Sequence, residues 1–385
     1  MSNRKLVILA LIAGVMVLWA VVQSRISHGP RAAPGTLAYL VQGLDPADIG
    51  SIVLGTGEGA VTLKREGGRF VAAGKDNYPT DPKEINSLLT KCLEIRTSQF
   101  ITDNPANHED LGVTEAKARS VVKFLKPDSS TLTGVIVGKD RELGEGSYVR
   151  LVSSDKVYVS PSAPWFGARA IDYLQQELTS AKREDILSVT VKSSGGEYTL
   201  KTGEDGKTVV LENMPEGKRL KSSDSETVFA ALTSLRLDDV RKNAGDLSFD
   251  RQFVCRLKDS TVYTIKIAQK DNKTYVTCQA DFTDTTPVVI KEGEVQSEEQ
   301  LKKNEAKLLS RDKAKEFTAK NQSWVYEIPE WKSKHLTKQL SDLLEDLPKP
   351  EEKTAEPNAV TTPQPNKVQI DVPKTIEVNE PNKIN

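Results

Sequence analysis

Two stretches of the chain, DIGSIVLGTGEGAVTLK (residues 48–64) and DILSVTVKSSGGEYTLK (residues 185–201), align without a gap. Asp, Ile, Ser, one Gly and the closing Thr-Leu-Lys fall at the same positions in both. Apolar and polar residues alternate around the glycines, which is the period of a half-buried strand. Both stretches are therefore predicted to be β-hairpins, and their likeness indicates that one structural unit is present twice.

Later phrases recur in the same order and extend the repeat. INSLLTKCLEI (85–95) resembles VFAALTSLRL (228–237), and SVVKFLKPDSSTLTGVIVGK (120–139) resembles FVCRLKDSTVYTIKIAQK (253–270). VYVSPSAPWFGARAIDYLQQEL (157–178) resembles VYEIPEWKSKHLTKQLSDLL (325–344). Each unit is predicted to contain a hairpin, a helix, three more strands and a closing helix. The predicted fold class is α+β, with an N-terminal transmembrane helix, two tandem homologous repeats and a disordered Pro-rich tail.

The repeat and the changes in composition divide the chain into segments. The predicted layout is a cytoplasmic N-terminus (1–5), a transmembrane anchor (6–22), a linker (23–44), repeat 1 (45–183), repeat 2 (184–347) and a disordered tail (348–385). Repeat 2 carries an extra charged helical stretch at about 283–322. Its apolar positions make only a thin stripe, which favours a solvated or edge-packed helix; a partner-binding helix is the alternative.

The N-terminal run from Leu6 to Val22 contains no polar side chain. Its length is at the short end of the ~17–25 residues that span a bilayer as a helix. Arg4 and Lys5 precede it, which favours a cytoplasmic N-terminus and places the bulk of the chain on the extracytoplasmic, periplasmic side. A cleaved signal peptide is the rival interpretation, although no small-residue cleavage pattern follows the run.

The overall charge disfavours a nucleic-acid-binding protein. The chain has 53 Lys plus Arg and 54 Asp plus Glu residues, for a formal net charge of −1. Binding to nucleic acid depends on a basic surface that neutralises phosphates, and this composition supplies no such excess.

No stretch of the sequence carries a convincing catalytic, cofactor or metal pattern. Gly55, Gly57 and Gly59 imitate a dinucleotide fingerprint, but an alternating strand rather than a helix follows them, so a hairpin turn is favoured. His108, in NPANHEDLGV, is adjacent to two acidic residues, yet a short helix capped by Asn104 explains the segment better. The chain is predicted to be non-enzymatic, with no cofactor and no bound metal.

Two pairs of residues leave a choice open. Cys255 and Cys278 lie in predicted strands of one repeat and form either a disulfide or, as is favoured, two buried free thiols. Trp165 and Trp331 occupy matching places after the Pro of each closing segment. We expect each indole to pack the closing helix onto its sheet; the alternative is a pair of exposed rings that stack on a ligand.

The phrases YPTDPKEINSLL, NPANHEDLGV and GEGSYVRLVSSDKVYVSP together resemble a bacterial family of membrane-anchored proteins of unknown function. The resemblance covers residues 45 to about 345, with Leu111 where the family often has Tyr. Family members are often encoded beside ABC-type transport systems related to gliding-motility components. The resemblance implies membrane-complex partners and carries no catalytic residues.

The sequence as a whole favours a membrane-anchored protein that binds other proteins as an accessory or scaffold of a membrane complex, such as an ABC-type transporter. Its expected location is the inner membrane. Binding of an envelope glycan or peptide is the second hypothesis, and a hydrolase with an unrecognised site is the third.

Overall fold

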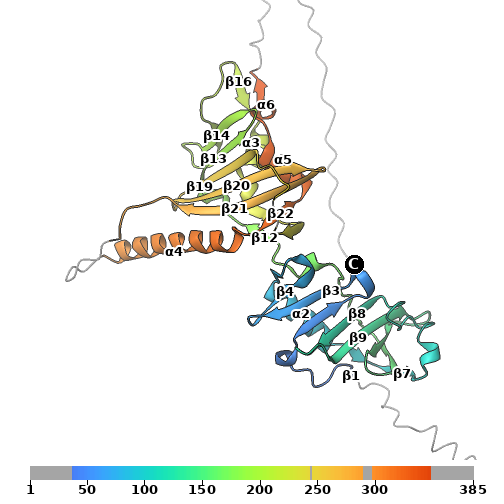
Figure 1. Ribbon diagram of the computed structural model, residues 1–385. Coiled ribbons are helices and arrows are strands. Elements are labelled where there is room, and N and C mark those ends of the chain that lie inside the picture. The colour runs from blue at the N-terminus through green and yellow to red at the C-terminus, as the bar shows by residue number, and fades with distance from the viewer. Residues whose placement is uncertain (1–36, 243–244, 289–296, 348–385) are drawn as a thin grey trace, which may run out of the picture. The chain divides into compact units, whose positions relative to one another are not determined.

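Two large antiparallel β-sheets dominate the protein, whose structure is a computed structural model (Figure 1). The structure describes residues 37–242, 245–288 and 297–347. The predicted transmembrane segment, Leu6 to Val22, and the Pro-rich tail therefore lie outside the described residues. Among the described helices, none is long and apolar enough to cross a membrane.

The first sheet has the strand order β5-β4-β3-β2-β8-β9-β10-β11-β7. Its strands are β2 (Ser51–Leu54), β3 (Val61–Glu66), β4 (Arg69–Ala72), β5 (Tyr78–Pro79), β7 (Gln99–Thr102), β8 (Ser120–Leu125), β9 (Thr131–Asp140), β10 (Ser147–Leu151) and β11 (Val157–Ser160).

The second sheet has the order β15-β14-β13-β19-β20-β21-β22-β18. Its strands are β13 (Ile186–Ser193), β14 (Gly196–Thr202), β15 (Val209–Leu211), β18 (Asp239–Arg241), β19 (Arg251–Leu257), β20 (Thr261–Lys270), β21 (Lys273–Phe282) and β22 (Val325–Ile328). Apart from β5, each strand of the first sheet has a counterpart at the same place in the second.

The hairpins that open the two copies pair in the same register. Ser51 lies opposite Lys64 in the first hairpin, and Ser188 lies opposite Lys201 in the second, at the aligned positions. The predicted strands on either side of the Gly-rich tip are confirmed. Gly57 adopts a φ of 66°, which only glycine reaches without strain, so the glycines serve the turn.

Two short ladders show where each copy begins. Strand β1 (Ala38–Tyr39) pairs with β6 (Arg96–Thr97), and β12 (Glu177–Thr179) pairs with β17 (Leu235–Arg236). Each ladder joins the segment before a hairpin to the segment after the following helix. Strand β12 therefore takes the place in the second copy that β1 takes in the first.

The first helix after each hairpin buries one face. Helix α2 (Pro82–Leu93) begins where the Asp81 side chain accepts a hydrogen bond from the Lys83 N–H, with Pro at the first turn. Its buried residues are Ile85, Leu88, Leu89 and Cys92, which share one face because they follow helical spacing. The counterpart in the second copy, α3 (Ser222–Phe229), is shorter.

The same backbone bond fastens the start of both helices. The N–H of Asp81 donates to the carbonyl of Tyr173 at 2.8 Å, and the N–H of Lys221 donates to the carbonyl of Leu343 at the same distance. Both acceptors lie in the closing segments, Tyr173 in the first copy and Leu343 in the second. The closing segment of each copy thus returns to hold the helix that follows its own hairpin.

Two parts of the α+β expectation are wrong. Antiparallel sheets make up most of the described secondary structure, so the fold is mainly β. The first closing segment forms only the 3₁₀ turn η5 (Ala170–Tyr173), because the chain then extends into β12; a closing helix exists only in the second copy, as α5 (Glu330–Thr337) and α6 (Leu340–Leu343). The remaining ladder joins β16 (Lys218–Leu220) to β23 (Leu344–Asp346).

The NPANHEDLGV segment covers the outer face of the first sheet. Asn104 caps the 3₁₀ turn η4 (Pro105–Asn107), as predicted, by accepting from the Ala106 N–H at 3.1 Å. Val113 is fully buried in a small cluster with Val121, Ile136 and Val157, which β8, β9 and β11 contribute. The segment is therefore a structural cover over strands that would otherwise expose apolar side chains.

Gly138 is required for this cover to approach β9. A Cβ at Gly138 would lie 2.5 Å from the Leu111 carbonyl oxygen and 2.7 Å from a Val113 methyl carbon. Gly138→Ala is expected to lower the free energy of unfolding by about 1–3 kcal/mol, as overpacking does. Urea denaturation followed by circular dichroism measures the change. Gly59→Ala, where a Cβ meets nothing within 4 Å, is the control and should change stability little.

Candidate functional site

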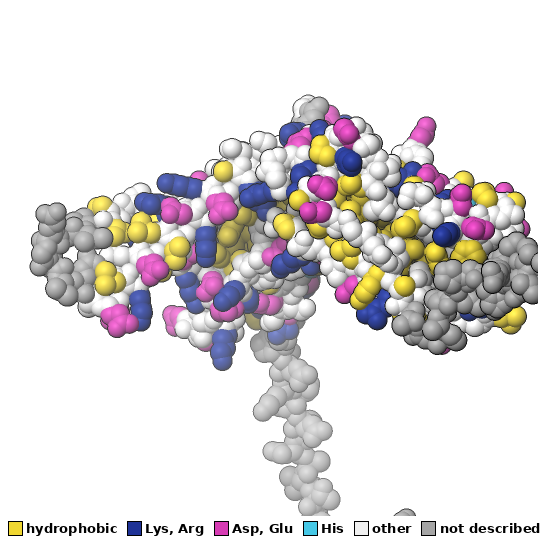
Figure 2. Space-filling model, turned by 90° about the horizontal axis from the view of Figure 1, so that it is seen from below, with side chains coloured by type: hydrophobic (Ala, Val, Ile, Leu, Met, Phe, Trp, Pro, Cys, Tyr) yellow, Lys and Arg dark blue, Asp and Glu magenta, His cyan; other side chains and the backbone are white. Residues whose placement is uncertain are grey.

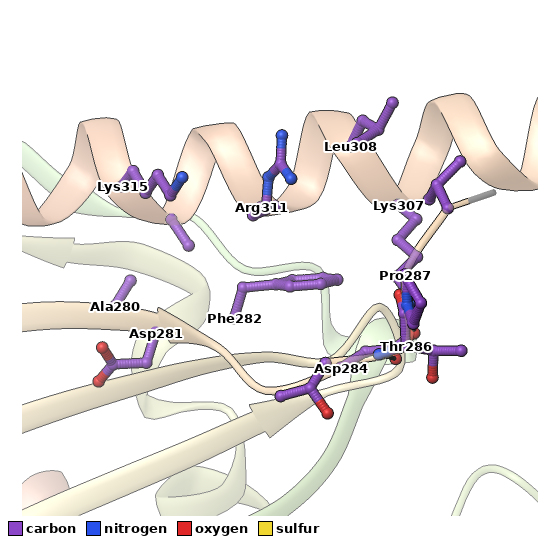
Figure 3. Close-up of a pocket in the computed structure, with 13 residues that line it drawn as sticks. Ala280, Asp281, Phe282, Asp284, Thr286, Pro287, Lys307, Leu308, Arg311 and Lys315 are labelled. Carbon is purple, nitrogen blue, oxygen red and sulfur yellow. Dashed lines mark hydrogen bonds and ion pairs between the residues drawn. The ribbon is translucent and has the colours of Figure 1, made fainter. Parts of the chain in front are cut away.

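A cavity lies between the inserted helix α4 (Glu298–Asn321) and β21 (Figure 3). The helix enters the chain between β21 and β22, where the first copy has only a short loop between β10 and β11. The stretch expected as an insertion, at about 283–322, is the segment between β21 and β22. The cavity has a volume of about 600 Å³, and residues 280–288 form the wall opposite the helix.

The C-terminal half of α4 is fastened to the second sheet. The Thr318 hydroxyl accepts from the Ala280 N–H at 2.8 Å and donates to the Ala280 carbonyl at 2.7 Å. The Phe317 ring meets the Tyr263 ring edge-on at 5.0 Å. Asn321, which is 2% exposed, accepts a hydrogen bond from the buried Tyr326 hydroxyl at 2.7 Å. This end of the helix is part of the packed structure.

The N-terminal half of α4 extends past the end of the sheet (Figure 1). Leu301 and Leu309 are each 51% exposed there. The Ser297 hydroxyl caps the helix by accepting from the Gln300 N–H. The expectation of an edge-packed helix thus describes one half of α4, while the other half presents exposed apolar side chains.

An ion pair holds the two walls of the cavity together. Lys307 Nζ lies 2.7 Å from Asp284 Oδ2 and donates to the Thr286 carbonyl at 2.5 Å. Figure 3 shows Lys307 reaching from the helix to these residues, while the Phe282 ring lies in the space between helix and strand. The Lys307 ammonium and hydrogen bonds from Thr286 lower the pKa of the Asp284 carboxyl to about 2.

The low pKa of Asp284 gives a direct prediction. Lys307→Met removes the first cause of the shift, so the carboxyl pKa is expected to rise from about 2 toward its ordinary value. Because the folded-state value is depressed, the stability that this group adds is present above its unfolded pKa and is lost as the pH falls toward 2. An NMR titration of the Asp284 side chain in both proteins measures the two midpoints. An unchanged midpoint would contradict the ion pair.

Three cations line the cavity from one face of the helix. Lys307, Arg311 and Lys315 follow one another at intervals of four residues, which places them on one side of an α-helix. The four-residue spacing of these cations is the sequence signal for a basic helix face, and the thin apolar stripe does not contain it. Asp281 and Asp284 lie on the opposite wall.

The two tryptophans at matching positions of the repeat, Trp165 and Trp331, are exposed, at 64% and 55%. The expectation that each indole packs a closing helix onto its sheet is therefore wrong. Phe166, the next residue after Trp165, is buried in its place, and Lys332 is buried at the aligned position of the second copy. Burial lowers the pKa of Lys332, whose Nζ donates to the Ala231 carbonyl at 2.9 Å.

The surroundings of the two indoles differ. Trp165 lines a small cavity of about 130 Å³ beside α2, together with Glu84, Lys91 and Asp172. Trp331 meets the His335 ring edge-on at 5.6 Å, on α5.

The remaining candidate residue, His108, is part of the packed structure. His108 is 5% exposed, and its Nε2 lies 2.9 Å from the Asp155 carbonyl oxygen. Among the residues that the structure describes, no group of three or more His, Cys, Asp or Glu side chains is arranged to hold a metal ion.

All three cysteines are buried and free. Cys255 and Cys278 lie on β19 and β21, with β20 between them. Two strand spacings amount to about 9.6 Å, which exceeds the ~7 Å limit for the Cα atoms of a disulfide. The favoured interpretation of buried thiols is thus the one that the structure has.

Burial also makes these thiols unreactive. It raises the pKa of Cys255 and of Cys278 to about 12 and raises the pKa of Cys92 as well, so the nucleophilic thiolate is suppressed. We expect a thiol reagent to label none of the three cysteines in the native protein and all of them in denaturant without reductant. Mass spectrometry counts the labels, and rapid labelling of the native protein would contradict the burial.

No curated protein and no solved structure matches the chain. One family model, described as a domain of unknown function (DUF4340), matches residues 71–250, from β4 of the first copy to the start of the β19 region in the second. The chain is therefore similar, over that range, to a family of unknown function.

Proposed function

We propose that the protein is a non-enzymatic accessory or scaffold component of a membrane complex, such as an ABC-type transport system. In this proposal the apolar run Leu6 to Val22 attaches the chain to the inner membrane and the remainder is extracytoplasmic. The resemblance of its sequence to membrane-anchored proteins encoded beside such transporters supports the class of partner.

The observation that carries the proposal is α4. The two copies share their strand order, so the sheet itself forms without such a helix, as the first copy shows. Helix α4 is therefore an addition to a complete fold. Its outer half presents Leu301 and Leu309, and exposed apolar side chains on an otherwise charged helix suit contact with another protein.

The surface charge agrees with a protein partner. On the face that Figure 2 shows, basic and acidic side chains are interspersed, and neither sign dominates a large area. A surface of this kind lacks the continuous basic footprint of a nucleic-acid-binding protein.

Affinity purification from detergent-solubilised membranes tests this function. The full chain is expected to retain membrane proteins that a Leu301→Ser/Leu309→Ser variant loses. Leu187→Ser is the matched control, because Leu187 is 45% exposed on β13, away from α4, and its removal should leave the partners in place. Recovery of the full chain alone would count against the proposal.

Binding of an envelope glycan or peptide is a second candidate, which the exposure of Trp165 and Trp331 favours. Exposed indoles offer flat faces for stacking. Soluble cell-wall glycan fragments should quench tryptophan emission in the full chain, and Trp165→Phe should abolish the response if the cavity beside α2 is the site. An unchanged response in both Trp165→Phe and Trp331→Phe would rule out these two indoles.

A further inference from the structure

One edge of strand β21 is paired with another described strand over only part of its length. Strand β22 pairs with it only from Thr274 to Val276. Further along, Ala280 directs its N–H and its carbonyl to the same side, where the Thr318 hydroxyl bonds both. The sheet edge is thus closed by a strand at one end and by a single side chain of α4 in the middle.

Beyond Thr318 the same edge opens into the cavity under α4. Alternate residues of an antiparallel strand direct their backbone groups to the same side, so Phe282 presents its N–H and carbonyl as Ala280 does. Within the described ranges, no hydrogen bond joins the Phe282 backbone to α4 or to residues 284–288. The end of β21 therefore offers a donor and an acceptor to a further extended segment.

The walls of the cavity define what such a segment would carry. Phe282, Leu308 and Ala314 supply apolar surface. Lys307 is engaged by Asp284, which leaves Arg311 and Lys315 as the cations on the helix side. Among the described residues, Arg311 has one ion-pair partner, Asp312, which lies 3.3 Å away and is 65% exposed. An apolar side chain followed by a carboxylate complements the helix side of the cavity, whereas Asp281 lies on the opposite wall.

We propose that this groove binds an extended peptide segment of the protein partner. The segment adds backbone hydrogen bonds to β21 at Phe282 and places an acidic side chain against Arg311 and Lys315. Addition of a strand to an open sheet edge is a common mode of peptide recognition, and about 600 Å³ is in the range of ligand pockets. This inference rests on the proposed function, since it names the surface and the chemistry of that partner.

Selection of linear peptides from a phage-displayed random library, on the purified full chain in detergent, tests the inference. The selected peptides are expected to share an acidic residue next to an apolar one. Their affinity, measured by fluorescence anisotropy, should fall about tenfold or more in Arg311→Glu/Lys315→Glu, since two exposed ion pairs are reversed. Lys303→Glu/Lys313→Glu makes the same charge change on the same helix outside the cavity and should keep the affinity.

Backbone methylation separates strand addition from simple charge attraction. Methylation of peptide N–H groups one at a time should weaken binding most at one position, where the N–H donates to the Phe282 carbonyl, because the neighbouring N–H groups face away from β21. Equal losses in both double-charge variants, or no position dependence in the methylated series, would overturn the inference.

The failure of this inference differs from the failure of the proposed function. If the full chain retains membrane proteins and Arg311→Glu/Lys315→Glu retains them equally, the groove is not the docking site while the accessory role stands. If acidic peptides bind the groove as described but no membrane protein is recovered, the peptide site stands and the accessory role fails.

Discussion

Phe253→Ala is expected to lower the free energy of unfolding by about 3–5 kcal/mol, the range for removing a buried aromatic ring. Phe253 is fully buried in β19, opposite Val191 on one side and Ile265 on the other. The cost combines the lost transfer free energy of the ring with the cavity that the strands on both sides cannot close. Urea denaturation followed by circular dichroism gives the value.

The repeat supplies a matched comparison for this variant. Val122 lies opposite Leu54 in the first sheet, as Phe253 lies opposite Val191 in the second, so the two positions are equivalent. Two residues further along, the sizes are reversed: Phe124 in the first copy corresponds to Cys255 in the second. Each core thus contains one large and one small side chain at these positions.

This exchange predicts the pattern of a small mutant series. Phe124→Ala should cost about as much as Phe253→Ala, whereas Phe253→Leu should cost clearly less because most of the volume remains. A loss below about 1 kcal/mol for both Ala variants would mean that neither ring fills a packed core.

The sequence predicted those parts of the fold that have a strong local pattern. The alternation in residues 51–66 and 186–202 placed both opening hairpins, and the four apolar residues of α2 followed helical spacing. Asn104 was identified as a cap because its side-chain oxygen satisfies a free N–H of the first turn.

The elements that were mistaken depend on distant partners. The strand β12 has only Glu177–Thr179, and it exists because β17, more than fifty residues later, pairs with it. The apolar spacing of the same region resembles a helix, so local sequence favoured a closing helix there. The fold is mainly β because two large antiparallel sheets account for most of its secondary structure.

The candidate groove could not be predicted from the sequence, because it also depends on contacts between distant segments. The sequence shows that Lys307, Arg311 and Lys315 share a helix face, but not what the face meets. The surface that this helix face meets depends on where β22 stops pairing with β21. The path of the chain after α4 determines that position. Similarly, the repeat placed Trp165 and Trp331 correctly in the alignment, yet the neighbouring Phe166 is the residue that the core accepts.

Asn321→Ala is expected to release the C-terminal end of α4 and to lower the free energy of unfolding by about 2–4 kcal/mol. The Asn321 amide joins two buried groups, since it accepts from the Tyr326 hydroxyl at 2.7 Å and donates to the Phe317 carbonyl at 2.7 Å. Tyr326 is fully buried, so its hydroxyl would lose this acceptor without gaining water and would keep the Tyr78 hydroxyl as its neighbour. Loss of such a buried hydrogen bond costs about 1–3 kcal/mol.

Tyr326→Phe distinguishes the lost hydrogen bond from lost packing, because it removes the hydroxyl and keeps the ring. If Tyr326→Phe/Asn321→Ala is no less stable than Asn321→Ala alone, the cost of the single variant lies in the stranded hydroxyl. Hydrogen exchange followed by mass spectrometry should then show faster exchange in residues 311–321 while β20 and β21 stay protected. Uniform loss of protection in the second sheet would instead mean that α4 is integral to the sheet, and the view of α4 as an addition to a complete fold would be wrong.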